Sequence, residues 1–258
     1  MLTLQGASGL LIISHRHKFI FIHIPKTAGE AVSDALTPIL GPEDLVLKTP
    51  PDIWLRSFTQ PQHRNLDGLS KHTRSRKVRS RIGTQMWNDY FTFAFVREPI
   101  ARMLSWYRYL GNVCEHREQV HPKHLWLYLT AAGRASDPRR WPAMEVFTKT
   151  SSFSEFLRPP DGIEPRLLAP QASYLAVERQ GPIAVDYVGK VESLDEHFEE
   201  VTQRLNLGKL HLPRRNVSTH SQPLAARDAT VTDEDRALLY ERYAHDYELF
   251  GYPRRAPL

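Results

Sequence analysis

The fold of this chain is decided by residues 19–30, which read FIFIHIPKTAGE. Apart from His23, residues 19–24 are apolar, largely β-branched and aromatic, which is the pattern of a buried strand in a parallel sheet. Pro25 ends the run because proline cannot donate a hydrogen bond to a sheet ladder. A short turn follows, and then a helical pattern with one buried face at 3.6-residue spacing, made of Ala28, Ala31, Val32, Ala35, Leu36 and Ile39.

A strand, a short cationic turn and a helix form a geometry that holds a phosphate group. Unpaired N–H groups at the start of a helix point at the anion, and the helix dipole favours negative charge there. Lys26 adds a full charge, Thr27 adds a hydroxyl, and Gly29 lets the backbone approach closely. The stretch predicts a phosphate site, although an ordinary strand-to-helix turn with a solvated lysine would share this pattern.

A second strand and helix are predicted in residues 90–110. Tyr90–Val96 reads as a core strand, and Pro99 stands where the first position of a helix is expected. The helix has an apolar stripe of five residues, Ile100, Met103, Leu104, Tyr107 and Leu110. Lys26 and Arg97 both follow strands, and ligands of parallel sheets bind beyond the carboxyl ends of the strands. We therefore expect these two distant cations to converge on one crevice.

The rest of the chain completes an α/β pattern. Residues 10–14 and 18–24 form a strand pair or one interrupted strand, 185–188 a short strand, and 70–82 a basic helix. Helices are also expected over 193–205 and from Thr232, where Thr232 and Asp235 resemble a capping box. Residues 112–182 read as a helical insertion that shapes the acceptor side. The pattern predicts a mostly parallel sheet with helices on both faces, in a single domain of residues 1–258.

Two motifs carry a resemblance to a known family. IPKTAGE, at residues 24–30, resembles the 5′-phosphosulfate loop of sulfotransferases that use 3′-phosphoadenosine 5′-phosphosulfate (PAPS), most of all the carbohydrate O-sulfotransferase branch, sulfotransferase family 2. FAFVREPIARMLSWYRYL, at residues 93–110, is similar to that family's 3′-phosphate motif. The resemblance extends over about residues 16–253 and implies a P-loop NTPase-like sulfotransferase fold.

The resemblance implies a donor site built from both motifs. Lys26 would bind the oxygen that bridges phosphorus and sulfur, where charge grows as the bond breaks. Arg97 and Ser105 map onto the family's 3′-phosphate ligands. An ion pair of Arg97 with Glu98, and a hydrogen bond of Ser105 to its own helix, are the alternatives. The residues implied as ligands of the 5′-phosphosulfate are Pro25, Lys26, Thr27, Ala28, Gly29 and Glu30.

Glu30 departs from the family pattern, which usually has threonine or serine here to help bind the 5′-phosphate. A carboxylate would repel that phosphate, although the start of a helix favours carboxylates. We expect Glu30 to turn away from the site. Weaker cofactor binding, or a part in proton handling, are the alternatives.

A general base must take the proton of the acceptor hydroxyl, and histidine is the commonest choice near neutral pH. His72, in the stretch GLSKHTR, stands where family members often carry a histidine and is the predicted base; a surface histidine among cations is the alternative. His23 is expected to be a satisfied core histidine. Residues 212–218 are similar to a loop that closes over the nucleotide, so Arg214 and Arg215 are secondary candidates for cofactor or acceptor contact.

Composition narrows the class of protein. The net charge of +5 fits an anionic ligand or partner without choosing between nucleotide, polysaccharide and nucleic acid. Cys114 is the single cysteine, which excludes an intramolecular disulfide and a cysteine-based metal site and indicates a reducing compartment. No apolar run approaches the roughly 20 residues that cross a bilayer. Animal members of the family carry an N-terminal membrane anchor, and this sequence shows no apolar run of that kind. We therefore expect a bacterial-type soluble enzyme of the cytoplasm, or else part of a longer protein.

The sequence thus predicts a metal-independent sulfotransferase that moves a sulfuryl group from PAPS to a hydroxyl acceptor, above all a saccharide, and releases 3′-phosphoadenosine 5′-phosphate (PAP). A nucleic-acid partner is not expected. A P-loop kinase is the first alternative, but the loop lacks G-x-x-x-x-G-K-[ST] and no downstream aspartate stands out as a magnesium ligand. A non-catalytic protein that binds polyanions through residues 71–81, and a sulfotransferase fold without activity, are the others. The sequence selects neither one acceptor nor an oligomeric state.

Overall fold

The computed structural model describes residues 11–47, 69–115, 142–159, 168–178, 181–213 and 228–254. The chain divides into two compact units, one formed by Met1–Arg97 with Gln171–Val217 and the other by Glu98–Pro170 with Ser218–Leu258. The single domain of residues 1–258, with a helical insertion at about 112–182, stays a prediction.

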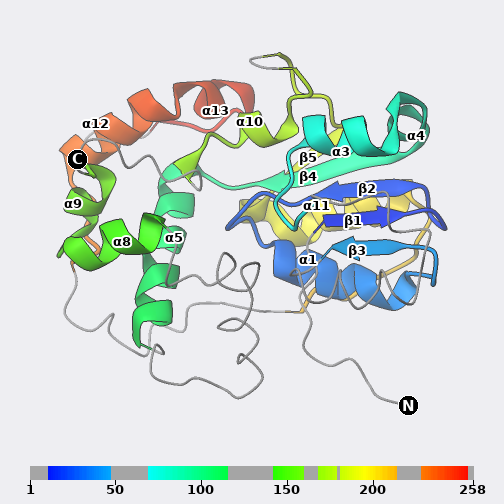
Figure 1. Cartoon of the computed structure of the whole chain (residues 1–258), viewed down its shortest axis with the longest axis horizontal. Coiled ribbons are helices and arrows are strands. Elements are labelled where there is room, and N and C mark those ends of the chain that lie inside the picture. The colour runs from blue at the N-terminus through cyan, green and yellow to red at the C-terminus, as the bar shows by residue number, and fades with distance from the viewer. Residues whose placement is uncertain are drawn as a thin grey trace. The chain divides into compact units, whose positions relative to one another are not determined.

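The first unit is built on a five-stranded sheet in the order β3-β1-β2-β4-β5, with β2 between β1 and β4 (Figure 1). The strands are β1 Leu11–Ser14, β2 Phe19–Ile22, β3 Leu45–Leu47, β4 Phe91–Val96 and β5 Tyr187–Lys190. β2 pairs with β4, and β4 with β5, in parallel, whereas β1 is antiparallel to both β2 and β3. The sheet is therefore mixed, where a mostly parallel one was predicted.

The antiparallel pairing of β1 has a local cause. Only residues 15–18 connect β1 to β2, and a parallel connection needs a crossover of a dozen residues or more. The Asp44 carboxylate holds this turn by accepting hydrogen bonds from the backbone N–H groups of His15 and Arg16, at 2.6 and 3.0 Å. Of the two readings left open for residues 10–24, the strand pair is confirmed.

Helices flank the sheet. Those of the first unit are α1 Gly29–Leu36, α3 Ser75–Ile82, α4 Thr84–Asp89, α10 Ala172–Leu175 and α11 Leu194–Arg204, with 3₁₀ turns at Thr37–Ile39 and Val191–Ser193. The predicted helix over 193–205 is confirmed as α11, and the basic helix begins at Ser75, five residues later than expected.

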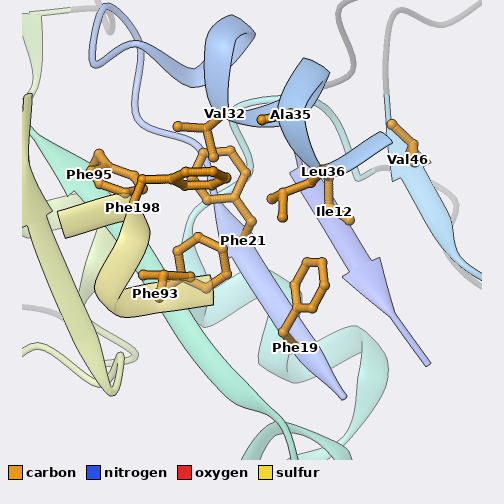
Figure 2. Close-up of a cluster of buried hydrophobic side chains, with 11 residues drawn as sticks. Ile12, Phe19, Phe21, Val32, Ala35, Leu36, Val46, Phe93, Phe95 and Phe198 are labelled. Atoms are coloured by element: carbon orange, nitrogen blue, oxygen red, sulfur yellow. The ribbon is translucent and has the colours of Figure 1, made fainter. Parts of the chain in front are cut away.

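Alternate side chains of β2 and β4 form the core that fixes α1 in place. Phe21 and Phe93 stack with their ring centroids 5.2 Å apart, and Val32 of α1 and Phe198 of α11 pack on the same cluster (Figure 2). Burying an apolar side chain of this size contributes about 1.5–3 kcal/mol. This packing holds α1 against one face of the sheet. The turn that connects β2 to α1 therefore has a fixed position at the carboxyl end of β2.

The second unit is helical. Its helices are α5 Pro99–Glu115, α8 Pro142–Lys149, α9 Phe153–Leu157, α12 Asp233–Arg242 and α13 Ala244–Leu249. Its core surrounds Tyr107 of α5, whose ring lies 5.1–5.5 Å from those of Phe147, Phe153 and Phe156. The capping box of Thr232 and Asp235 is confirmed at the start of α12. The helix expected from Thr232 is α12, which ends before Tyr243, where the backbone leaves the helical range and α13 follows. Among these described helices, none has the length and apolar character of a membrane span.

Candidate active site

The turn between β2 and α1 has an unusual backbone. Lys26 and Ala28 both have positive φ angles, of 69° and 58°, in the left-handed region that side chains other than glycine seldom adopt. Residues held in this region cluster at binding and active sites. Ala28 is the N-cap of α1, and no side chain caps the helix there. Since the first N–H groups of a helix need partners from outside it, this end of α1 is suited to an anion.

Thr27 stabilises the turn itself. Its buried hydroxyl donates a hydrogen bond to the Ile24 carbonyl oxygen at 2.8 Å, so the hydroxyl proton is used within the turn. Pro25 is buried beside it. The direct contacts of both residues with a phosphate group stay predictions.

Gly29 makes room for the ring of His23. A Cβ atom at position 29 would lie 1.8 Å from Cδ2 and 2.0 Å from Nε2 of His23, far inside van der Waals contact. The space at Gly29 is thus occupied by a histidine ring of the protein, and the expected close approach to a phosphate group stays a prediction.

Lys26 lies among other cations. Its pKa is lowered to about 8, first by burial and then by the positive charges of Arg97 and Lys71, while Glu30 acts in the opposite direction. Burial also lowers the pKa of Lys71, again opposed by Glu30. Lys26, Lys71 and Arg97, called here the cation cluster, thus hold an excess of positive charge that a bound anion would relieve.

Glu30 acts directly on this cluster. Attraction to its carboxylate raises the pKa of both Lys26 and Lys71. The expectation that the Glu30 side chain turns away from the site stays a prediction.

The sheet brings Arg97 to the same edge as Lys26. β2 and β4 are adjacent and parallel, with Ile22 paired to Ala94, so the residues after both strands leave the sheet on one side. The effect of Arg97 on the Lys26 pKa agrees with this placement. Lys26 and Arg97 thus leave the sheet at one edge, while the crevice that they would share stays a prediction.

Gln171 fixes the backbone of Arg97. The Gln171 side-chain oxygen accepts from the Arg97 N–H at 2.9 Å, and its amide nitrogen donates to the Arg97 carbonyl at 2.8 Å. Gln171 is fully buried. Sequence analysis missed this residue because an isolated glutamine 74 positions away carries no pattern that points to Arg97.

His72 lies beside the turn, on the loop before α3. Its ring centroid is 4.6 Å from that of His23, and its Nδ1 atom is 3.4 Å from the His23 carbonyl oxygen. His23 is buried, as expected, but its Nδ1 atom has no hydrogen-bond partner among the described residues. The expectation of a satisfied core histidine is thus wrong for this atom.

The other predicted residues belong to the second unit or to segments outside the described residues. Ser105 is part of α5 in the second unit, and Arg214 and Arg215 lie outside the described residues. The Arg102 side chain is buried and donates to the Ala169 carbonyl at 3.0 Å. Glu98 accepts hydrogen bonds from the Ala101 N–H, at 2.7 Å, and from the Tyr247 hydroxyl, so its carboxylate caps α5.

Comparisons with known proteins agree on one family. A sequence profile described as the sulfotransferase family matches residues 10–253. The chain is 26% identical to carbohydrate sulfotransferase 14 of Homo sapiens, over 94% of this chain and 60% of the relative. It is 27% identical to carbohydrate sulfotransferase 12 of Mus musculus, over 95% of this chain and 60% of that relative. The chain thus spans about 60% of the length of these relatives. No solved structure gives a significant match.

Proposed function

The chain belongs to the sulfotransferase family, and from this premise we propose that it transfers a sulfuryl group from PAPS to a hydroxyl group of a carbohydrate. The observation that carries the proposal is the cation cluster at the uncapped start of α1. A donor with a phosphosulfate and a separate phosphate needs two cationic contacts, and Lys26 and Arg97 stand at one edge of the sheet.

The residues present fit such a donor. Two cations, Arg97 and Lys71, lie close enough to lower the Lys26 pKa, and α1 offers backbone N–H groups that no side chain caps. A P-loop-like mode of binding, with the 5′-phosphosulfate at residues 25–30 and the 3′-phosphate at Arg97, is the arrangement we propose. Ser105, Arg214 and Arg215 remain proposed ligands on family grounds.

PAPS supplies an activated sulfuryl group whose bond to the 5′-phosphate oxygen breaks as the bond to the acceptor oxygen forms. In this proposal Lys26 stabilises the negative charge that grows on the leaving oxygen. His72 takes the acceptor proton, for which a neutral imidazole is needed. Lys26 on the leaving side and His72 on the attacking side make a divalent metal unnecessary, so we also propose metal-independent turnover.

The class of acceptor is proposed from the relatives, whose names identify them as carbohydrate sulfotransferases. Location in the cytoplasm is proposed as well, from the single cysteine, which favours a reducing compartment. The kinase and the polyanion-binding protein are not favoured by the family match.

A transfer assay with sulfur-labelled PAPS tests the proposal. We expect label to reach a hydroxyl-bearing oligosaccharide, unchanged by a metal chelator, and to be lost in Lys26→Met. Lys149→Met is the matched control, since Lys149 is exposed in the second unit and pairs with Glu145 at 2.7 Å. Transfer from ATP with magnesium, in the absence of transfer from PAPS, would overturn the proposal.

A further inference from the structure

The helix α3 exposes a group of cations. The side chains of Arg76, Lys77 and Arg81 are exposed, whereas Ser75 and Val78 are buried, so the basic residues share the outer face of the helix. No acidic residue occurs in α3, whose sequence is SRKVRSRI. Among the residues that the structure describes, no carboxylate forms an ion pair with Arg76 or Arg81. The outer face of α3 therefore carries positive charge that the described part of the fold does not neutralise.

This placement of charge opposes the stability of the helix. The dipole of a helix favours acidic residues in the first turn, yet the first turn of α3 has none and contains Arg76 and Lys77. Lys77 and Arg81 are four positions apart on the helix, where like charges repel each other. Because an element with charges that oppose its own stability is typical of a functional surface, the outer face of α3 is a candidate site for an anionic partner.

The helix begins close to the proposed active site. His72, the predicted base, stands three residues before Ser75, so at most about 11 Å of chain separates the two. The positive charge of Lys71, the preceding residue, acts on Lys26 and lowers its pKa. An acceptor chain with one hydroxyl at His72 would therefore have its next sugar residues within reach of α3.

Packing against the first unit holds α3 in this place. Val78 is fully buried, and the Arg74 guanidinium lies 5.3 Å from the centroid of the buried Tyr174 ring, which belongs to α10. The outer cations are thus presented by an anchored helix. No aromatic residue occurs in α3, so this face offers no ring on which a nucleic-acid base could stack.

Resting on the proposed function, we propose that the outer face of α3 binds an acceptor polysaccharide that itself carries carboxylate or sulfate groups, so that the enzyme selects anionic over neutral saccharide chains. Arg76 and Arg81 contact the anionic groups of sugars that neighbour the sulfated one. These contacts are made equally before and during transfer, so they contribute to acceptor binding and not to the chemical step.

A double variant removes the contacts and leaves the cation cluster in place. Arg76→Gln combined with Arg81→Gln takes two positive charges from the outer face of α3. The matched control combines Arg16→Gln, in the turn before β2, with Lys209→Gln, after α11, and removes two charges from the same unit. All four side chains are exposed, so neither variant opens the core.

The readout is a titration with oligogalacturonate, which has one carboxylate per sugar, at several salt concentrations, with a maltooligosaccharide of equal length as the neutral probe. We expect the wild type to prefer the oligogalacturonate, with an affinity that falls as salt rises. The double variant should bind it about 2-fold to 30-fold more weakly, as expected for two exposed ion pairs. Its salt dependence should be less steep by about one unit of log–log slope for each cation removed.

The control variant should match the wild type in these titrations, and both variants should bind PAP as the wild type does. In the transfer assay with the anionic acceptor, the double variant should raise the acceptor KM and leave kcat unchanged.

Equal affinity of the wild type for the anionic and the neutral oligosaccharide would overturn the proposal, and this result needs no variant to fold. So would equal affinity of the double variant and the control for oligogalacturonate, or tighter binding of a single-stranded oligonucleotide with the same number of charges. If the wild type transfers no sulfuryl group to either saccharide, the proposed function fails, while the titrations still decide whether α3 binds anionic saccharides.

Discussion

Binding of PAP should draw a proton onto Lys26. In the free protein the Lys26 pKa is about 8 against an ordinary 10.5, because the ammonium group is buried and faces Arg97 and Lys71. A phosphate dianion beside it reverses the balance of charge and raises that pKa. At pH 8 about half of the Lys26 side chains are neutral before binding, so the complex should take up about half a proton.

The affinity for PAP should therefore fall as the pH rises above 8. The interval between 8 and 10.5 corresponds to about 3 kcal/mol of differential interaction, which is the upper limit of the loss. The free energy of unfolding of the ligand-free protein should change with pH in the opposite direction. Between these pH values the unfolded chain binds more protons than the ligand-free fold, so the free energy of unfolding should rise with pH there.

Calorimetry at pH 8 in buffers of different ionisation enthalpy measures the proton uptake directly. The phosphates of PAP are ionised at this pH, since their second pKa is about 6. Lys26→Arg stays charged and should bind PAP without the uptake, Lys71→Arg should keep most of it, and Lys149→Met should match the wild type. Equal uptake in the wild type and Lys26→Arg would refute the reasoning.

Three further predictions follow from the same contacts. Gly29→Ala should lower the free energy of unfolding, measured by denaturant titration, by about 1–3 kcal/mol, because the new Cβ would meet the His23 ring. In the His23→Ala background most of this loss should disappear, and an equal loss there would contradict the reasoning. Gln171→Ala should weaken PAP binding by about tenfold in a titration, because both backbone groups of Arg97 lose their partner; unchanged affinity would contradict this. Glu30→Gln should move the fall in PAP affinity to lower pH, because Glu30 raises the Lys26 pKa, and an unmoved profile would count against that role.

Local sequence patterns predicted the elements that position the site. β4 and the start of α5 at Pro99 agree with the prediction from residues 90–110. The capping box of Thr232 and Asp235 also agrees with its prediction, since the two residues are only three positions apart. These features succeed because strand periodicity, proline placement and helix capping are set by residues close together in the chain.

Side-chain contacts between residues far apart in the chain were not predicted. The amide of Gln171 meets Arg97 across 74 positions, and the ring of His23 meets His72 across 49. The mixed sheet could have been found from the short link at residues 15–18, since four residues cannot form a parallel crossover.

The most direct test of the central claim is thermal unfolding with and without PAP. If Lys26 and Arg97 bind the two ends of one doubly phosphorylated nucleotide, PAP at a hundred times its dissociation constant should stabilise the protein by about 2.7 kcal/mol, and adenosine 5′-monophosphate at the same concentration should do much less. No shift at millimolar PAP, or an equal shift with ATP, would contradict the account.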